Sequence, residues 1–178
     1  PEFDSFNREI VLETLWEDIQ QHINEGLRPD FVVFTGDLAY HGQKEEYELA
    51  EKYFIDPLLH EITGLSKARL FVVPGNHDID WGEIDTDVAD QMLGILPSRD
   101  RITQFLGPDT DRGAAFRKFK GYADFVNTKF RGIQTFSDQD YFYTRALEIG
   151  GCKIAIMGLN SAWMSGCHRD KDGNALDQ

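Results

Sequence analysis

The residues best suited to chemistry follow two short apolar runs of the sequence. Residues 70–73 form one run and end at Pro74-Gly75-Asn76-His77-Asp78, and residues 31–34 form the other and end at Thr35-Gly36-Asp37. Four specified residues in order occur by chance in a chain of this length roughly once in a thousand, whereas Gly-Asp after a strand is an ordinary turn. Carboxylate, amide and imidazole groups can bind metals or transfer protons. The alternative interpretation is a capped turn with a hydrogen-bonded histidine.

The two apolar runs are the elements that must position these groups. Both are short and rich in β-branched and aromatic residues, which predicts strands buried on both faces. Residues 45–64 between them show helical spacing, with Pro57 kinking or restarting the helix. A strand–helix–strand unit of this length permits parallel strands, whose carboxyl ends share one edge of the sheet. We therefore expect Asp37 to lie close to Asn76, His77 and Asp78.

The rest of the chain predicts further helices and a hairpin. A first helix is expected from a cap at Asp4 or Ser5 to a stop at Gly26. Another amphipathic helix is expected at residues 116–126. Strands at residues 141–149 and 153–157 are expected to form a hairpin that turns at Gly150-Gly151.

Residues 81–113 predict an insertion or lid. The segment is rich in Asp and is interrupted by Pro97 and Pro108. The sequence contains no internal repeat and no linker of domain length, so residues 1–178 are expected to belong to a single domain.

Together, the two strand-end motifs resemble the calcineurin-like metallophosphoesterase family. The likeness covers nearly the whole chain and is most specific between residues 31 and 78. It implies an α/β fold, a metallophosphoesterase-type αββα sandwich with mixed sheets that this chain covers only in part. The family's motifs are Asp-x-His, Gly-Asp, Gly-Asn-His-Asp/Glu, a lone His and Gly-His-x-His, and only the second and third occur here. We expect the others to lie before residue 1 and after residue 178, so that this segment alone is incomplete and inactive.

The resemblance also implies roles for the motif residues. Asp37 would bridge two divalent metal ions, and Asn76 would give a neutral oxygen to one of them. His77 would not bind metal; it would stabilise the phosphoryl oxygens and protonate the leaving oxygen, with Asp78 orienting its imidazole. The reaction would be hydrolysis of a phosphate mono- or diester by a metal-bound hydroxide. The metals expected are Mn, Fe, Zn or Mg.

The remaining polar residues give weaker candidates. Asn160 leaves a predicted strand on the expected sheet edge, and His41 follows Asp37 closely, so both are candidate substrate-binding residues, although a solvated loop is the simpler interpretation of His41. His168 follows a polar loop rather than a strand, so we reject it as a metal ligand. His22 and His60 lie late in predicted helices, where a structural role is sufficient.

Composition restricts the partners and the compartment. The net charge of −13, from 18 basic and 31 acidic residues, repels nucleic acid and anionic lipid, so we expect neither partner and disfavour a nuclease. No apolar run approaches the roughly 20 residues of a membrane span. Cys152 and Cys167 suit a reducing compartment, which favours the cytoplasm. A second hypothesis is a non-catalytic regulatory or interaction module on this fold, within a larger signalling protein or a self-associating chain.

Overall fold

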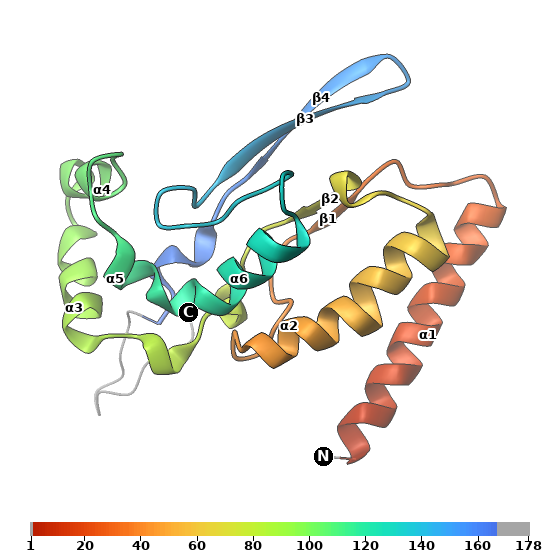
Figure 1. Ribbon diagram of the computed structural model, residues 1–178, viewed down its shortest axis with the longest axis horizontal. Coiled ribbons are helices and arrows are strands. Elements are labelled where there is room, and N and C mark those ends of the chain that lie inside the picture. Colours follow the sequence, from red (N-terminus) through yellow and green to blue (C-terminus); the bar gives the residue numbers. More distant parts are fainter. Residues whose placement is uncertain (1, 167–178) are drawn as a thin grey trace. The chain divides into compact units, whose positions relative to one another are not determined.

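Helices and two small sheets make up the α/β fold of this chain. The computed structural model describes residues 2–166 (Figure 1). The chain divides into two compact units: unit 1 comprises Pro1–Val33 and Glu48–Phe71, and unit 2 comprises Phe34–Tyr47 and Val72–Gln178. The boundary between the units passes through the two strands of the first sheet, and each unit is built from two separate stretches of sequence.

Unit 1 consists mainly of helices. Helix α1 (Glu2–Asn24) packs against η2 (Pro57–Thr63), and Trp16 lies over Phe54 with ring centroids 5.3 Å apart. The predicted stop of α1 is confirmed: Gly26 has φ +91°, and the N–H of Leu27 reaches back to the carbonyl of His22 at 2.9 Å.

The predicted start of α1 is wrong. The helix already includes Asp4 and Ser5, because it begins at Glu2. Propensity allows a helix to continue through a residue that could cap it, so a capping side chain alone does not fix the first turn.

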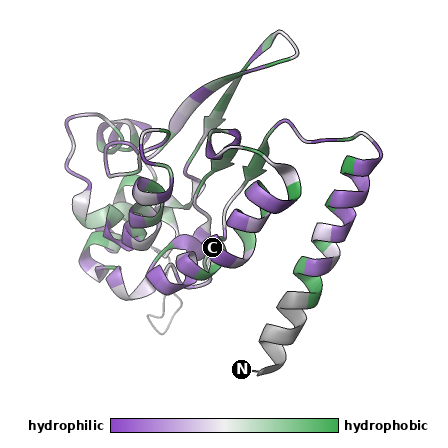
Figure 2. Ribbon diagram, turned by 45° about the vertical axis from the view of Figure 1, so that its right-hand side comes forward, coloured by the Kyte–Doolittle hydropathy of each residue, from purple (hydrophilic) through white to green (hydrophobic). Residues whose placement is uncertain are grey.

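The first sheet pairs β1 (Val32–Phe34) with β2 (Leu70–Val72). The N–H of Val73 donates to the carbonyl of Phe34, and the segments that leave the two strands meet, so both strands run in the same direction. Both strands are largely hydrophobic (Figure 2). All of β2 is buried, as predicted, but the same prediction is wrong for β1, because Val33 is 49% exposed.

The segment between these strands is helical for most of its length. It comprises α2 (Lys44–Ala50), the π-helical turns η1 (Glu51–Ile55) and η2, and the 3-10 turn η3 (Lys67–Arg69). Pro57 is the first residue of η2, but Asp56 before it keeps helical backbone angles, φ −66° and ψ −46°, so the helical segment runs on and a kink or restart at Pro57 stays a prediction. At this position the proline needs no N–H partner within the turn.

Unit 2 has an aromatic core. The helical run of α5 (Gly113–Phe116), η6 (Arg117–Phe119) and α6 (Lys120–Lys129) buries Phe116, Phe119, Tyr122 and Val126, as the spacing predicted. Phe136 packs on three of these rings, and the shortest separation between centroids is 4.9 Å, to Tyr122. Residues 81–113 begin with η5 (Trp81–Glu83), α3 (Thr86–Ile95) and α4 (Arg99–Phe105).

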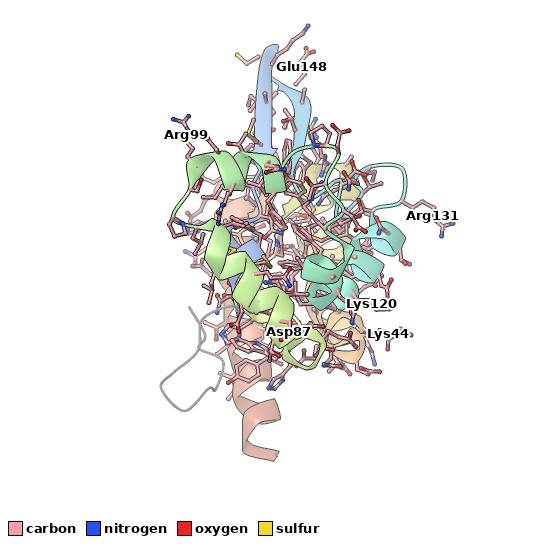
Figure 3. The ribbon with its side chains drawn as sticks, turned by 90° about the vertical axis from the view of Figure 1, so that its left-hand side faces the viewer. Lys44, Asp87, Arg99, Lys120, Arg131 and Glu148 are labelled. Carbon is pink, nitrogen blue, oxygen red and sulfur yellow. The ribbon has the colours of Figure 1, made fainter. Side chains whose placement is uncertain are left out.

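The second sheet is the predicted hairpin of β3 (Tyr143–Ile149) and β4 (Cys152–Gly158). Ile149 pairs with Cys152, so the turn is Gly150-Gly151, with φ +56° and +82°, the conformation of a two-residue turn that suits the twist of paired strands. The strand begins at Tyr143, so the prediction that it starts at residue 141 is wrong. Figure 3 shows Glu148 at the far end of this hairpin.

Candidate active site

The carboxylate of Asp78 joins the two predicted motif turns. Asp78 is fully buried in the 3-10 turn η4 (Asn76–Asp78) that follows β2. Its Oδ2 accepts the N–H of Asp37 at 2.7 Å and that of Gly75 at 2.9 Å, while Oδ1 accepts the N–H of Ala39 at 2.9 Å. The N–H of Leu38 lies 3.3 Å from Oδ2, and the hydroxyl of Tyr47 donates to Oδ1 at 3.0 Å. The turns after β1 and β2 are therefore held together, as the strand-end argument predicted.

Burial and these donors act on the pKa of Asp78 in opposite directions. Burial raises the pKa of this carboxyl, and the N–H groups of Gly75, Ala39 and Asp37 and the hydroxyl of Tyr47 lower it, with a net rise. Burial, and next to it the Asp78 charge, raises the pKa of Tyr47 far above its usual range. The raised pKa favours the neutral Tyr47 hydroxyl, which is the form that donates to Asp78.

Asp37 adopts a left-handed backbone conformation that most side chains avoid. It has φ +62°, in the left-handed region, and it is the only non-glycine residue with positive φ in the described part of the chain. Asp and Asn tolerate this region better than other side chains. Its Oδ1 accepts the N–H of His77 at 3.2 Å. A Cβ at Gly75 would collide with the Asp37 carboxylate, and one at Gly36 would lie 2.6 Å from the Gly75 Cα, so both glycines allow the turns to approach.

His77 is oriented by a backbone carbonyl. Its Nδ1 lies 3.1 Å from the carbonyl oxygen of Tyr40, and its ring stacks on the Tyr40 ring with centroids 5.0 Å apart and planes 12° apart. A carbonyl only accepts hydrogen bonds, so the contact assigns the proton to Nδ1. In the neutral ring, Nε2 is then the nitrogen that carries no proton. The Asp78 carboxylate accepts backbone N–H groups. Its predicted role in orienting the His77 ring stays a prediction.

His41 belongs to the same cluster of rings. Its ring is perpendicular to the Tyr40 ring with centroids 4.5 Å apart, so His41 and His77 both contact Tyr40. Its Nδ1 lies 3.2 Å from Oε1 of Glu46, and its side chain is 63% exposed. The structure thus brings this candidate substrate-binding residue next to His77, on the solvent side.

Asn160 is placed differently. It lies two residues after the end of β4 and is only 9% exposed, and it lines a small cavity together with Val73 and Pro74. His168 lies outside the described residues. Asn160 is therefore close to the end of β2 but turned into the protein, and its predicted substrate role stays a prediction.

Two residues of this site had no role in the sequence-based assignment. They are Tyr47, whose hydroxyl contacts Asp78, and Tyr40, whose carbonyl contacts His77. The position of Tyr47 ten residues after Asp37 gives no signal that its hydroxyl reaches Asp78. Tyr40 acts through its backbone carbonyl and its ring face, which no pattern of residue types reveals.

Asp37 and Asn76 fit part of a metal site. Asn76 is the first residue of η4, next to the His77 N–H that Asp37 accepts, so a carboxylate and an amide oxygen occupy one edge of the sheet. Residues 2–166 contain no group of three His, Cys, Asp or Glu side chains placed to hold a metal ion. The donor set suits two hard or borderline ligands of a larger site and not a complete one.

Across the described residues, none of the helices combines the length and the apolar character that crossing a bilayer requires.

Comparison with known proteins identifies relatives of this chain. It is similar to a probable glycerophosphodiester phosphodiesterase of Arcobacter nitrofigilis, 32% identical over 74 residues, which are 42% of this chain and 24% of that protein. It is also similar to a cAMP/cGMP dual specificity phosphodiesterase of Mycobacterium tuberculosis, 34% identical over 93 residues, which are 52% of this chain and 27% of that protein. The match thus spans about a quarter of each relative's length. No solved structure gives a significant match.

The family assignment rests on a longer match. The sequence profile of the calcineurin-like phosphoesterases matches residues 8–156, which include both motif turns and the hairpin. With the turns held together by Asp78, the chain belongs to the calcineurin-like phosphoesterase family.

Proposed function

We propose that the protein hydrolyses phosphodiesters with two divalent cations, and that this chain supplies part of the site. The observation that carries the proposal is the clamp formed by Asp78, which brings Asp37 and the Asn76–His77 turn to one edge of the sheet. The alternative of a capped turn with an ordinary histidine accounts for the hydrogen bonds of Asp78. It does not account for the left-handed backbone of Asp37, which places the Asp37 carboxylate beside His77.

In this proposal Asp37 and Asn76 would help to hold the two cations, Asp37 through its carboxylate and Asn76 through its amide oxygen. Bound cations would polarise the phosphoryl oxygens and lower the pKa of a water molecule. The further ligands are proposed to come from sequence outside residues 1–178, so that residues 1–178 form a single incomplete domain. Residues 81–113 remain a proposed insertion or lid. Manganese, iron, zinc and magnesium are all compatible with one carboxylate and one amide.

His77 acts as general acid in this proposal. With both ring nitrogens protonated, the imidazolium would give its Nε2 proton to the leaving oxygen while a hydroxide derived from water bonds to phosphorus and the bond from phosphorus to the leaving oxygen breaks. An alcohol leaves and a phosphomonoester remains. The Tyr40 carbonyl holds Nδ1–H and therefore aims Nε2 away from Tyr40. Asp78 keeps the two turns in register, and it orients His77 through the short η4 turn that both residues share.

The substrate class follows from the relatives and from charge. Both relatives are described as phosphodiesterases, one of a glycerophosphodiester and one of cyclic nucleotides. The net charge of −13 disfavours long polyanions, so we propose a small phosphodiester. His41 and Asn160 are proposed to contribute to substrate binding, His41 from the exposed side of Tyr40. A cytoplasmic location remains part of the proposal.

The second candidate function is a non-catalytic regulatory or interaction module. The observation that favours it is the lack of a three-ligand metal cluster among residues 2–166. The two candidates differ in what the full protein contains: the enzyme binds two metals, and the module binds none.

The test uses the full protein, purified and dialysed against Mn²⁺ or Zn²⁺. We expect two metal ions per chain by elemental analysis and faster hydrolysis of bis(p-nitrophenyl) phosphate than of p-nitrophenyl phosphate. If the protein binds metal but hydrolyses p-nitrophenyl phosphate faster, the substrate would be a phosphomonoester and not a phosphodiester. Neither metal nor turnover would establish the module.

A further inference from the structure

A small internal cavity lies beside the end of β2, next to the turn that carries the catalytic candidates. Its walls include Val73 and Pro74, which precede that turn, Tyr122 from α6, Gln134, and Asn160 after β4. The space available to a water molecule is about 10 Å³. That is about the volume open to the centre of a single water molecule, and too small for any organic ligand.

Polar atoms without partners point to an occupant for this cavity. Tyr122 Oη, Gln134 Oε1, and Oδ1 and Nδ2 of Asn160 are buried and have no hydrogen-bond partner among the described residues. The three residues are 0%, 6% and 9% exposed. A buried polar group that forms no hydrogen bond destabilises the fold, and native proteins contain few of them, so three such side chains lining one cavity call for an explanation.

The chemistry of these atoms matches water. Nε2 of Gln134 donates to the carbonyl of Val72 at 3.2 Å, which leaves Oε1 as an acceptor. The Tyr122 hydroxyl can donate, and the Asn160 amide offers either a donor or an acceptor. Water both donates and accepts, and buried waters typically make about three hydrogen bonds. A metal cation would need more oxygen ligands than these, and Nδ2 of Asn160 would repel it.

We infer that this cavity binds one ordered water molecule, which joins Asn160 at the end of β4 to Tyr122 and Gln134 beside the end of β2. The segment after β4 is thereby joined through one solvent molecule to α6 and to the loop that follows α6. This gives Asn160 a role inside the protein, independent of the proposed hydrolysis and of any contact with substrate.

The direct test is a high-resolution crystal structure of the full protein. We expect one peak of solvent density within hydrogen-bond distance of Tyr122 Oη, Gln134 Oε1 and one atom of the Asn160 amide. An empty cavity would overturn the inference. So would a side chain from elsewhere in the protein that fills the cavity, or a peak with the short contacts of a metal ion.

A second test asks whether a mutation in the cavity wall raises or lowers the melting temperature. Tyr122→Phe removes one hydroxyl and leaves the ring in the core. If the hydroxyl binds the water, the melting temperature falls, whereas removing a truly unpartnered hydroxyl raises it. Tyr141→Phe is the matched control, because the Tyr141 hydroxyl donates directly to the Leu106 carbonyl at 2.9 Å and its loss lowers the melting temperature. A rise for Tyr122→Phe beside a fall for Tyr141→Phe would overturn the inference.

Asn160→Leu supplies an independent second variant of similar size. With water bound, the variant loses the bridge and leaves Tyr122 and Gln134 with an incomplete partner, so its melting temperature falls. With a dry cavity, the apolar side chain relieves two unpartnered atoms and the melting temperature rises. A rise in the melting temperature would contradict the water site.

Discussion

Asp37 shows how a single residue can combine backbone strain with a chemical role. Its left-handed backbone turns the carboxylate toward the N–H of His77, and its own N–H is held by Asp78. A β-branched residue would be strongly disfavoured at this φ, whereas Asn would retain the backbone conformation. The charge at position 37 can therefore be removed without disturbing the turn.

Asp37→Asn should abolish metal bridging in the full protein and leave the fold intact. An amide shares an oxygen between two cations poorly, so the metal content should fall well below that of the unmodified protein, with a circular dichroism spectrum unchanged. Elemental analysis gives the measurement. Asp80→Asn is a matched control, because Asp80 Oδ1 also accepts one backbone N–H, from Gly82, outside the site. Two metals per chain in the Asp37 variant would rule out the bridging role.

His77→Gln should slow turnover and leave the metal content near normal. General acid catalysis contributes about 10²- to 10⁴-fold, and poor leaving groups need protonation most. The loss should therefore be larger for alkyl esters than for nitrophenyl esters, measured as kcat for each substrate. His60→Gln is the control, because His60 is an exposed histidine whose Nε2 lies 3.8 Å from Asp56. Equal losses for the two ester classes would contradict the acid role.

At the scale of the element, the start of α2 is organised by Glu46. Its Oε2 accepts the N–H of His41 at 2.8 Å and that of Gln43 at 3.1 Å, so it returns to the residue before the helix in the manner of a capping box. Burial raises the pKa of Glu46, but these N–H groups and the contact with the His41 ring outweigh it, and the pKa is lowered from 4.5.

Glu46→Gln should therefore destabilise the protein by about 1 kcal/mol at neutral pH. Because the folded pKa lies below the unfolded value of 4.5, the stabilisation is fully present above pH 4.5 and is lost as the pH falls through the folded pKa. Urea unfolding at several pH values measures it. Glu45→Gln removes the same charge from an exposed side chain in the same turn. If the difference in unfolding free energy between the two variants stays constant down to pH 3, the stabilisation does not come from the Glu46 charge.

The segment at residues 81–113 is fastened at its end by a buried cation. Arg112 is 2% exposed, and its guanidinium donates to the carbonyls of Phe105 and Asp138 at 2.9 and 2.6 Å and to Oε1 of Gln139 at 2.8 Å. It also lies over the Tyr141 ring at 5.0 Å. If residues 81–113 act as a lid, its motion must come from the part before Arg112.

Arg112→Met should destabilise the protein by about 3 kcal/mol or more, because several carbonyls lose a charged donor and stay buried. Thermal unfolding measures the effect. Arg99→Met is the control: Arg99 projects from α4 into solvent in Figure 3, and its loss should change stability by less than about 0.5 kcal/mol. Similar melting temperatures for the two variants would show that the Arg112 contacts contribute little.

At the scale of the whole molecule, the hairpin has an apolar face that the described residues only partly cover. Leu147, Ile149, Ile154 and Ile156 share this face through the register of β3 and β4, and all are only half-buried. Neither hairpin strand has a third neighbour within residues 2–166. Such edges and faces favour pairing with further strands or with another copy.

The 178-residue chain by itself should accordingly hold little metal and show little phosphoesterase activity. A carboxylate and a neutral amide displace too little water to retain two cations at ordinary concentrations. Calorimetry with Mn²⁺ and Zn²⁺ and a nitrophenyl ester assay check this, with size-exclusion chromatography to detect self-association. Two tightly bound ions per chain would mean that the remaining ligands lie within these residues.

The sequence predicted the parts of the fold that depend on spacing. The meeting of Asp37 with the Asn76–Asp78 turn followed from two strands and a crossover, and the hairpin turn at Gly150-Gly151 followed from residue type. The exposure of Val33 could not be predicted, because an apolar run does not tell how many neighbours its strand has. The burial of Arg112 was missed because most of its partners are backbone carbonyls, which no pattern of residue types reveals.

The hydrogen bonds of Asp78 also have a consequence for how the chain emerges from a ribosome. Asp37 precedes Asp78 by 41 residues, and synthesis at about 5–20 residues per second separates them by roughly 2 to 8 seconds. During that interval the turn after β1 has been made, but the carboxylate that holds it has not. The nascent turn therefore samples other conformations, and this edge of the sheet becomes ordered only when the second motif has been translated.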